Sequence, residues 1–139
     1  MAAAKRSGPA ALPVRRGEKP WTEAELGKVH GALEAEIVEL RTNIDQAESE
    51  IAERLGDAVG GAGDDQADAG AKTFQREYDL SLTQNARDLL VLSQNALARI
   101  DDGTYGVCAS CGQPIGKARL QAFPRATLCV ECKQREERR

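Results

Sequence analysis

Apolar residues recur at alternating spacings of four and three along the first half of the chain. The positions are Leu26, His30, Leu33, Ile37, Leu40, Ile44, Ala47 and Ile51, with His30 as the polar exception. This heptad pattern predicts one long helix with a coiled-coil seam. Thr22 followed by Glu25 has the spacing of a capping box, which places the helix start just after Trp21. The seam runs on to Leu55, where glycines interrupt it.

The run GDAVGGAG separates this segment from a second one with the same spacing. Its predicted seam is Tyr78, Leu82, Asn85, Leu89, Leu92 and Ala96. We expect this helix to begin near Asp65 and end near Ile100, and we expect Asn85 to lie on the inner face and set the register. Two long helices joined by a short loop predict an antiparallel coiled-coil hairpin with its tip loop near residues 56–68.

The flanking segments lack this periodicity. Residues 1–20 are rich in proline and basic residues, which predicts a disordered basic tail. Aromatic residues make up only 4% of the chain, which favours narrow helical seams over a thick core. The predicted fold class is mostly α: a coiled-coil hairpin over residues 21–102, a small module over 103–133, and a short charged tail over 134–139.

Four cysteines give this small module its chemistry. Cys108 and Cys111 form one pair with two intervening residues, and Cys129 and Cys132 form another. This arrangement is typical of two-knuckle zinc sites. Four thiolates complete a tetrahedral shell and leave no open position for a reactive water, so we expect one structural Zn²⁺. The competing interpretations are a redox dithiol or two disulfides, and the metal content per chain separates them.

The small module has few apolar residues with which to build a core. Ile115, Leu120, Phe123 and Leu128 are the candidates, so zinc binding should supply much of its folding free energy. Zinc knuckles also bind nucleic acid, and basic residues are present for that role. They are Lys117, Arg119, Arg125, Lys133 and Arg135. They lack an aromatic stacking platform, so nucleic-acid binding stays a secondary hypothesis.

Charge and the remaining residue types exclude several classes of function. The net charge of −3 conceals a basic start and an acidic stretch over residues 21–100, which argues against broad binding to duplex DNA. We expect a protein partner and no sequence-specific DNA binding. The sequence has no membrane-spanning run and no secretory signal, which predicts a cytoplasmic protein. His30 has no neighbouring nucleophile, so we interpret it as a packed seam residue and expect no enzymatic activity.

Several short motifs occur in an order that matches a known family. They are Ala96-Leu-Ala-Arg-Ile100, Gly103-Thr-Tyr-Gly106, Cys108, Cys111-Gly112, Arg119-Leu120, Pro124, Cys129 and Cys132. With the upstream hairpin, this order closely resembles the DksA/TraR zinc-finger family. The resemblance implies a regulator that binds RNA polymerase and inserts its coiled-coil tip through the secondary channel. It also implies action without reading promoter sequence. The alternative is a zinc-stabilised adaptor that docks another protein.

The resemblance also assigns expected roles to single residues. The family carries Asp-x-x-Asp-x-Ala at its hairpin tip, which corresponds here to Asp65 and Asp68, with Gly70 in place of the alanine. The alternative role for these aspartates is capping of the second helix. Members that respond to guanosine tetraphosphate use basic residues around the zinc module, and Lys133 matches one of them.

Two other positions depart from that nucleotide-responsive pattern. Leu92 stands where a lysine is expected, and Phe123 stands where an arginine is expected. Neither side chain can pair with a phosphate. We therefore expect weak or absent synergy with guanosine tetraphosphate. A two-helix coil whose seam is satisfied internally further predicts a monomer.

Overall fold

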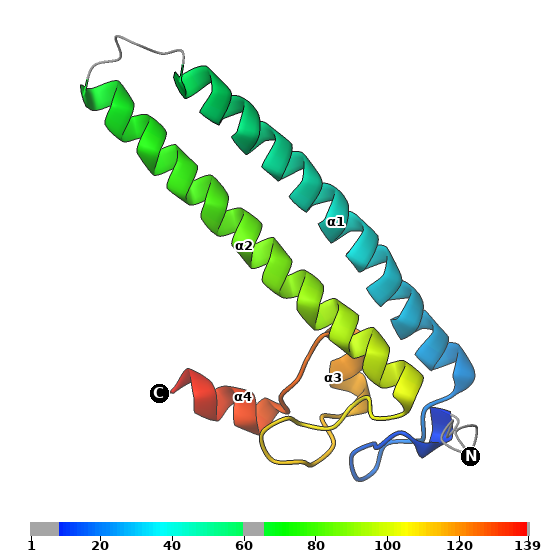
Figure 1. Cartoon of the computed structure of the whole chain (residues 1–139). Coiled ribbons are helices and arrows are strands. Elements are labelled where there is room, and N and C mark those ends of the chain that lie inside the picture. The colour runs from blue at the N-terminus through cyan, green and yellow to red at the C-terminus, as the bar shows by residue number, and fades with distance from the viewer. Residues whose placement is uncertain (1–8, 60–65, 139) are drawn as a thin grey trace. The chain divides into compact units, whose positions relative to one another are not determined.

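The computed structural model describes residues 9–59 and 66–138, and these are mostly helical. The elements in chain order are η2 (Pro9–Ala11), α1 (Glu23–Val59), α2 (Gln66–Asp102), α3 (Lys117–Ala122) and α4 (Val130–Glu137), as Figure 1 shows. The mostly helical class, with two long helices and a four-cysteine module, is confirmed. The first long helix ends later than expected, because α1 continues beyond Leu55 through Gly56 to Val59. None of the described helices is long and apolar enough to cross a membrane.

The chain divides into two compact units. One unit comprises the residues up to Glu36 together with those from Leu92 onward, and the other comprises Ile37–Val91. Within each unit α1 and α2 run antiparallel, as shown by the pairing of His30 with Asp101 in the first unit. In the second unit the ion pairs Arg54–Asp79 and Arg87–Glu48 show the same direction.

The predicted start and seam of α1 are both confirmed. The Thr22 N–H donates to Glu25 Oε1 at 3.0 Å, and the Glu25 N–H donates to Thr22 Oγ1 at 3.1 Å. These reciprocal bonds satisfy two amides that the first turn of a helix leaves without partners. Along the seam Leu33 is 0% exposed, Ile37 is buried, and His30 is half-buried.

Residues 9–20, here called the N-terminal segment, differ from the predicted disordered tail. Leu12 is 4% exposed and belongs to the hydrophobic core of the first unit, next in sequence to a short 3₁₀ turn. The segment shows no apolar periodicity because it packs as irregular chain and not as a helix. Its buried leucine is therefore invisible to pattern analysis. Residues 1–8 of the predicted tail lie outside the described residues.

In the second unit, the residues of α2 that point toward α1 are shifted by one position from the predicted seam. Tyr78 is 55% exposed and Asn85 is also exposed, so the prediction that these two residues face α1 was wrong. Leu82 is 52% exposed but still lines a hollow together with residues of α1. Asp79 and Thr83 point inward instead. A shift of one residue rotates a helix face by about 100°. The predicted residue Ala96 is buried with 2% exposure, because it packs into the core of the first unit.

The distal seam is consequently polar and loosely packed. Thr83 donates its hydroxyl to the Asp79 carbonyl within α2, and Asp79 pairs with Arg54 of α1. A hollow of about 230 Å³ lies along this stretch, and Ala47 and Ala86 are among the residues lining it. Two ion pairs, Arg54–Asp79 and Arg87–Glu48, join the helices along this stretch.

Candidate metal centre

The first cysteine pair lies in a tight turn after α2. The Cys108 N–H donates to the Gln113 carbonyl at 2.9 Å, and the Gly112 N–H donates to the Cys108 carbonyl at 3.0 Å. Gly112 has a φ of 75°, a left-handed conformation that favours glycine. An isolated bridge between Val107 and Pro114 closes the base of the turn. These bonds turn the two thiols of the pair toward one point.

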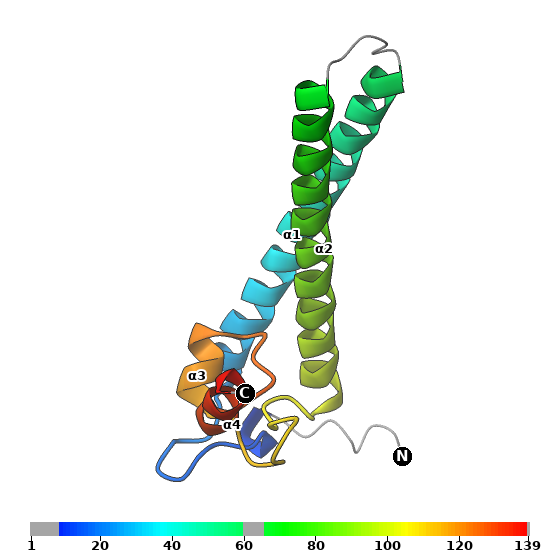
Figure 2. The same ribbon diagram turned by 90° about the vertical axis from the view of Figure 1, so that its left-hand side faces the viewer.

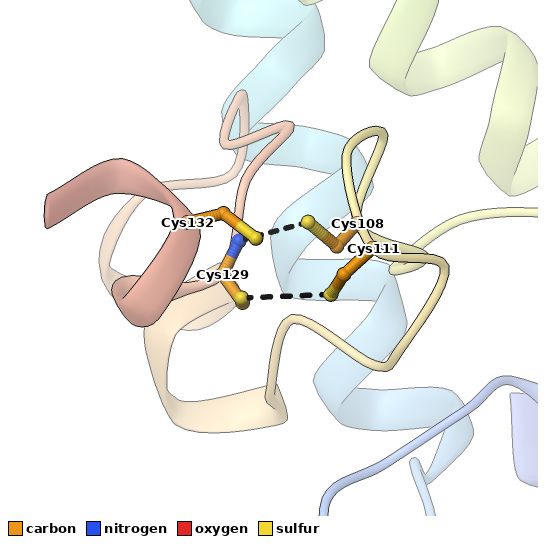
Figure 3. A group of neighbouring side chains, drawn as sticks. All are labelled: Cys108, Cys111, Cys129 and Cys132. Carbon is orange, nitrogen blue, oxygen red and sulfur yellow. Dashed lines mark hydrogen bonds between the residues drawn. The ribbon is translucent and has the colours of Figure 1, made fainter. Parts of the chain in front are cut away.

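The second cysteine pair lies at the start of α4. Cys129 is the N-cap residue and Cys132 lies in the first turn, so the helical repeat brings the two thiols to one side. The Ala109 N–H donates to the Thr127 carbonyl at 2.8 Å and joins the two loops. The Cys129 N–H also points at Cys108 Sγ, at 3.4 Å. Figure 3 shows the two pairs facing one another.

The geometry of the four sulfur atoms fits a single zinc ion. All four lie within 4.8 Å of one another, and Cys111 Sγ is 3.9 Å from Cys129 Sγ. Zinc–sulfur bonds of about 2.3 Å in a tetrahedron require sulfur separations of about 3.8 Å. None of the four cysteines forms a disulfide. The predicted ligand set, Cys108, Cys111, Cys129 and Cys132, is thus brought together, and it holds one structural Zn²⁺.

Electrostatics at the sulfurs also favours a cation. Burial opposes ionisation of Cys108, but the backbone N–H groups of Cys111, Cys129 and Ser110 outweigh it and lower the pKa of its thiol to about 6. At Cys132 the Ser110 hydroxyl favours the thiolate, but hydrogen bonds with Cys129 and burial raise the pKa to about 12. Neighbouring thiolates repel each other, and a divalent cation removes this conflict.

A small core supports the metal loops. Ile115 is 2% exposed and Leu120 is 0% exposed, whereas Phe123 is 61% exposed and contributes little to this core. Tyr105 packs against Trp21, with ring centroids 6.2 Å apart, and donates its hydroxyl to the Pro124 carbonyl at 2.9 Å. Burial also raises the pKa of the Tyr105 phenol. The zinc module thus shares its core with the first part of α1, and Figure 1 and Figure 2 show the module at the end where α1 begins and α2 ends.

The other predicted site residues are Asp65, Asp68 and Lys133. Asp65 is outside the described residues, and Asp68 is exposed in the first turn of α2. Lys133 is exposed on α4 and lines an open groove of about 630 Å³ together with Leu92 and Phe123. The three positions that the family comparison singled out for nucleotide response therefore lie around one groove.

Sequence patterns missed the contribution of the N-terminal segment to this centre. Arg15 and Arg16 line a groove beside the metal site that Cys111, Cys129 and Cys132 also line. Glu18 accepts hydrogen bonds from the backbone of α3, at Lys117 and Ala118. In the sequence, Leu12 and Trp21 are two large apolar residues in or beside a proline-rich stretch, and no pattern indicates that they are buried.

Comparison with known proteins finds a family match for the cysteine module. The sequence profile of the family described as prokaryotic dksA/traR C4-type zinc finger matches residues 103–138. A solved structure of transcription factor DksA2 from Pseudomonas aeruginosa is similar with a TM-score of 0.67 and 33% identity. It covers 84% of this chain and 85% of that one.

Two bacterial proteins are similar to this chain in sequence, one over 117 residues and the other over 75. The RNA polymerase-binding transcription factor DksA of Escherichia coli K12 is 30% identical over 117 residues, which cover 84% of this chain and 74% of that protein. The protein of the same name from Caulobacter vibrioides NA1000 is 43% identical over 75 residues, or 54% of this chain. That match spans about half of the Caulobacter protein, 53% of its length.

Proposed function

Because the chain belongs to the DksA/TraR family of C4-type zinc-finger proteins, we propose that it is a transcription regulator that binds RNA polymerase. The observation that carries this proposal is the similarity to relatives named RNA polymerase-binding transcription factors, over both the helices and the zinc module. The protein acts in the cytoplasm as a monomer and performs no catalysis of its own.

The helical hairpin is the element that acts on the polymerase. It enters the secondary channel and brings the start of α2 toward the catalytic centre, where Asp65 and Asp68 alter initiation complexes. Asp68 is exposed in the first turn of α2, and this position at the start of the second long helix supports the role. Helix capping by Asp68 is compatible with the same position.

The test separates binding from effect. Purified polymerase from the source organism transcribes a ribosomal RNA promoter in the presence of wild-type protein or Asp65→Asn/Asp68→Asn. Asp45→Asn removes an exposed carboxylate from α1 and serves as the matched control. We expect the double variant to bind polymerase like wild type but to lose its effect on transcript yield, while the control keeps both.

Two outcomes contradict parts of the proposal. If wild-type protein does not bind polymerase, the regulator hypothesis fails and an adaptor that docks another protein takes its place. If wild type binds and the double variant alters transcription as strongly as wild type does, the role of the tip aspartates fails while polymerase binding stands. Helicity and zinc content are measured for every variant so that misfolding is recognised.

The groove around Lys133 supports weak or absent synergy with guanosine tetraphosphate. Two of its cations are engaged: Arg125 pairs with Glu36, and Arg119 stacks on Phe123 at 5.6 Å and donates to the Leu128 carbonyl at 3.0 Å. Glu136 and Glu137 also line the groove and repel phosphate. Titration of the nucleotide against protein and polymerase together should leave the transcriptional effect nearly unchanged, and a large enhancement would contradict this.

A further inference from the structure

The N-terminal segment lies against the zinc module through both apolar and polar contacts. Leu12 belongs to one buried cluster with three of the four zinc-ligating cysteines: Cys108, Cys129 and Cys132. Arg15 forms an ion pair of 3.4 Å with Glu131, which lies between the two cysteines of α4. A single segment, distant in sequence, therefore contacts the elements that carry the metal ligands.

Glu18 supplies the cap that α3 lacks. The N-cap residue Gly116 has no side chain with which to accept the first amides of α3, whereas the Lys117 N–H donates to Glu18 Oε1 at 2.9 Å. The Ala118 N–H donates to Glu18 Oε2 at 3.1 Å. Burial opposes the charge of Glu18, but these N–H groups and that of Arg15 outweigh it and lower the pKa of the carboxyl. The connection spans 99 residues of sequence.

The backbone at Gly116 allows Arg15 to approach closely. A Cβ atom at this position would lie 2.9 Å from Arg15 Cδ, and the φ of 115° also disfavours any other residue. Arg15 is thus packed over the start of α3 while its guanidinium reaches α4. The positive φ therefore favours glycine at Gly116, and the absence of a side chain there leaves room for that of Arg15.

Positive charge is concentrated beside the sulfur atoms. Arg15, Arg16 and Arg135 line one groove of about 580 Å³ with Cys111, Cys129 and Cys132, and Glu131 is the acidic residue in the same lining. A zinc ion with four thiolates carries a net charge of about −2. Arginines that line the same groove offset part of this charge, and outer-shell partners of this kind commonly affect metal affinity.

We propose that residues 12–18 retain the zinc ion: Leu12 and Glu18 hold the N-terminal segment on the module, and Arg15 and Arg16 offset the charge of the thiolates. Docking of the segment and binding of zinc are then linked. By thermodynamic reciprocity, the factor by which the docked segment raises zinc affinity equals the factor by which zinc favours docking. Both directions of this linkage can be measured.

The first experiment measures zinc release from the full chain into excess chromogenic chelator. Glu18→Gln and Arg15→Gln are compared with Glu39→Gln and Arg41→Gln, which change exposed residues of α1 in the second unit. We expect each N-terminal variant to release zinc about tenfold faster than wild type, and each control to match wild type. Release rates equal to those of the controls in both N-terminal variants would overturn the proposal.

The second experiment uses wild-type protein and so does not depend on the folding of a variant. Trypsin cleaves after Arg15 and Arg16, and mass spectrometry follows these two bonds separately from the rest of the chain. We expect them to be protected in the zinc-loaded protein and to become sensitive after chelation, with protection restored when zinc is added back. Equal cleavage rates with and without zinc would show that the segment does not respond to the metal and would reject the linkage.

Discussion

At the scale of single residues, Glu18 and Tyr105 stand out because each satisfies backbone groups of a distant segment. The Glu18 carboxylate accepts from the amides of α3, and the Tyr105 hydroxyl donates to the Pro124 carbonyl. Charge-assisted bonds of the first kind are stronger than neutral bonds of the second kind. Replacing either residue should therefore have a measurable and different effect on stability.

Replacement of Glu18 by Gln should lower stability by about 1 kcal/mol, because the neutral amide keeps only one acceptor oxygen for the two amides of α3. The folded-state pKa of Glu18 lies below its ordinary value of 4.5. The stabilisation is therefore full above that value and is lost as pH falls through the folded-state pKa. Thermal unfolding of wild type, Glu18→Gln and the control Glu39→Gln, measured from neutral to acid pH, tests this. If the difference in stability between Glu18→Gln and wild type grew as the pH fell below 4.5, Glu18 would not be the cap of α3.

Replacement of Tyr105 by Phe should cost about 1 kcal/mol, because the partly buried Pro124 carbonyl loses its donor while the ring contact with Trp21 remains. Chemical denaturation of the zinc-loaded protein gives the change. The exposed residue Tyr78 provides the matched control, since Tyr78→Phe removes a hydroxyl from a side chain that is 55% exposed. Equal effects of the two substitutions would mean that the hydrogen bond contributes nothing.

The sequence predicted the residues whose chemistry depends on local spacing. All four cysteines were found because two short turns fix each pair and the residue type has few other uses. The role of Glu18 could not be found in this way, because its partners in α3 lie 99 and 100 residues away. No local pattern distinguishes a glutamate that caps a distant helix from one that is solvated.

At the scale of elements, the seam of α1 was predictable and that of α2 was not. In α1 one stripe of Leu and Ile residues dominates. In α2 two stripes compete, one residue apart: Tyr78 and Leu82 on one, Asp79 and Thr83 on the other. The structure buries the polar stripe over the second unit, because Asp79 pairs with Arg54 of α1. Hydrophobic periodicity alone predicts that the stripe with Tyr78 and Leu82 is the buried one.

The loosely packed distal seam should accept a larger side chain. Ala47→Leu places extra methyl groups in the hollow of about 230 Å³ that Ala47 lines, and cavity filling of this kind stabilises by about 0.5–2 kcal/mol. Hydrogen exchange of the α2 amides in the second unit reports the change. Ala52→Leu, at an exposed position of α1, controls for helix propensity. Equal protection in both variants would show that the hollow does not accept the side chain.

At the scale of the whole molecule, the metal and the hydrophobic core are parts of one cooperative structure. The zinc module has few buried apolar residues of its own and shares its core with Trp21 and the first turns of α1. Zinc binding should thus stabilise segments that contain no metal ligand. The N-terminal segment was predicted to be a separate tail because its composition gives no sign of this shared core.

Chelation of zinc should therefore be visible at the single tryptophan of the chain. Trp21 is 2% exposed in the folded protein and lies against Tyr105 and Lys117. We expect its fluorescence emission to shift to longer wavelength when zinc is removed, while most of the far-ultraviolet helical signal from α1 and α2 remains. An emission maximum that does not move on complete zinc removal would contradict the shared core.

The long sequence separation between Glu18 and α3 has a consequence for the route of folding. Contacts between residues 99 apart form late, because closing a long loop costs chain entropy before any contact compensates for it. Pairing of α1 with α2 shortens the effective loop, so we expect the hairpin to form first and the N-terminal segment to dock last. A newly made chain would then acquire its zinc before it acquires full resistance to proteases.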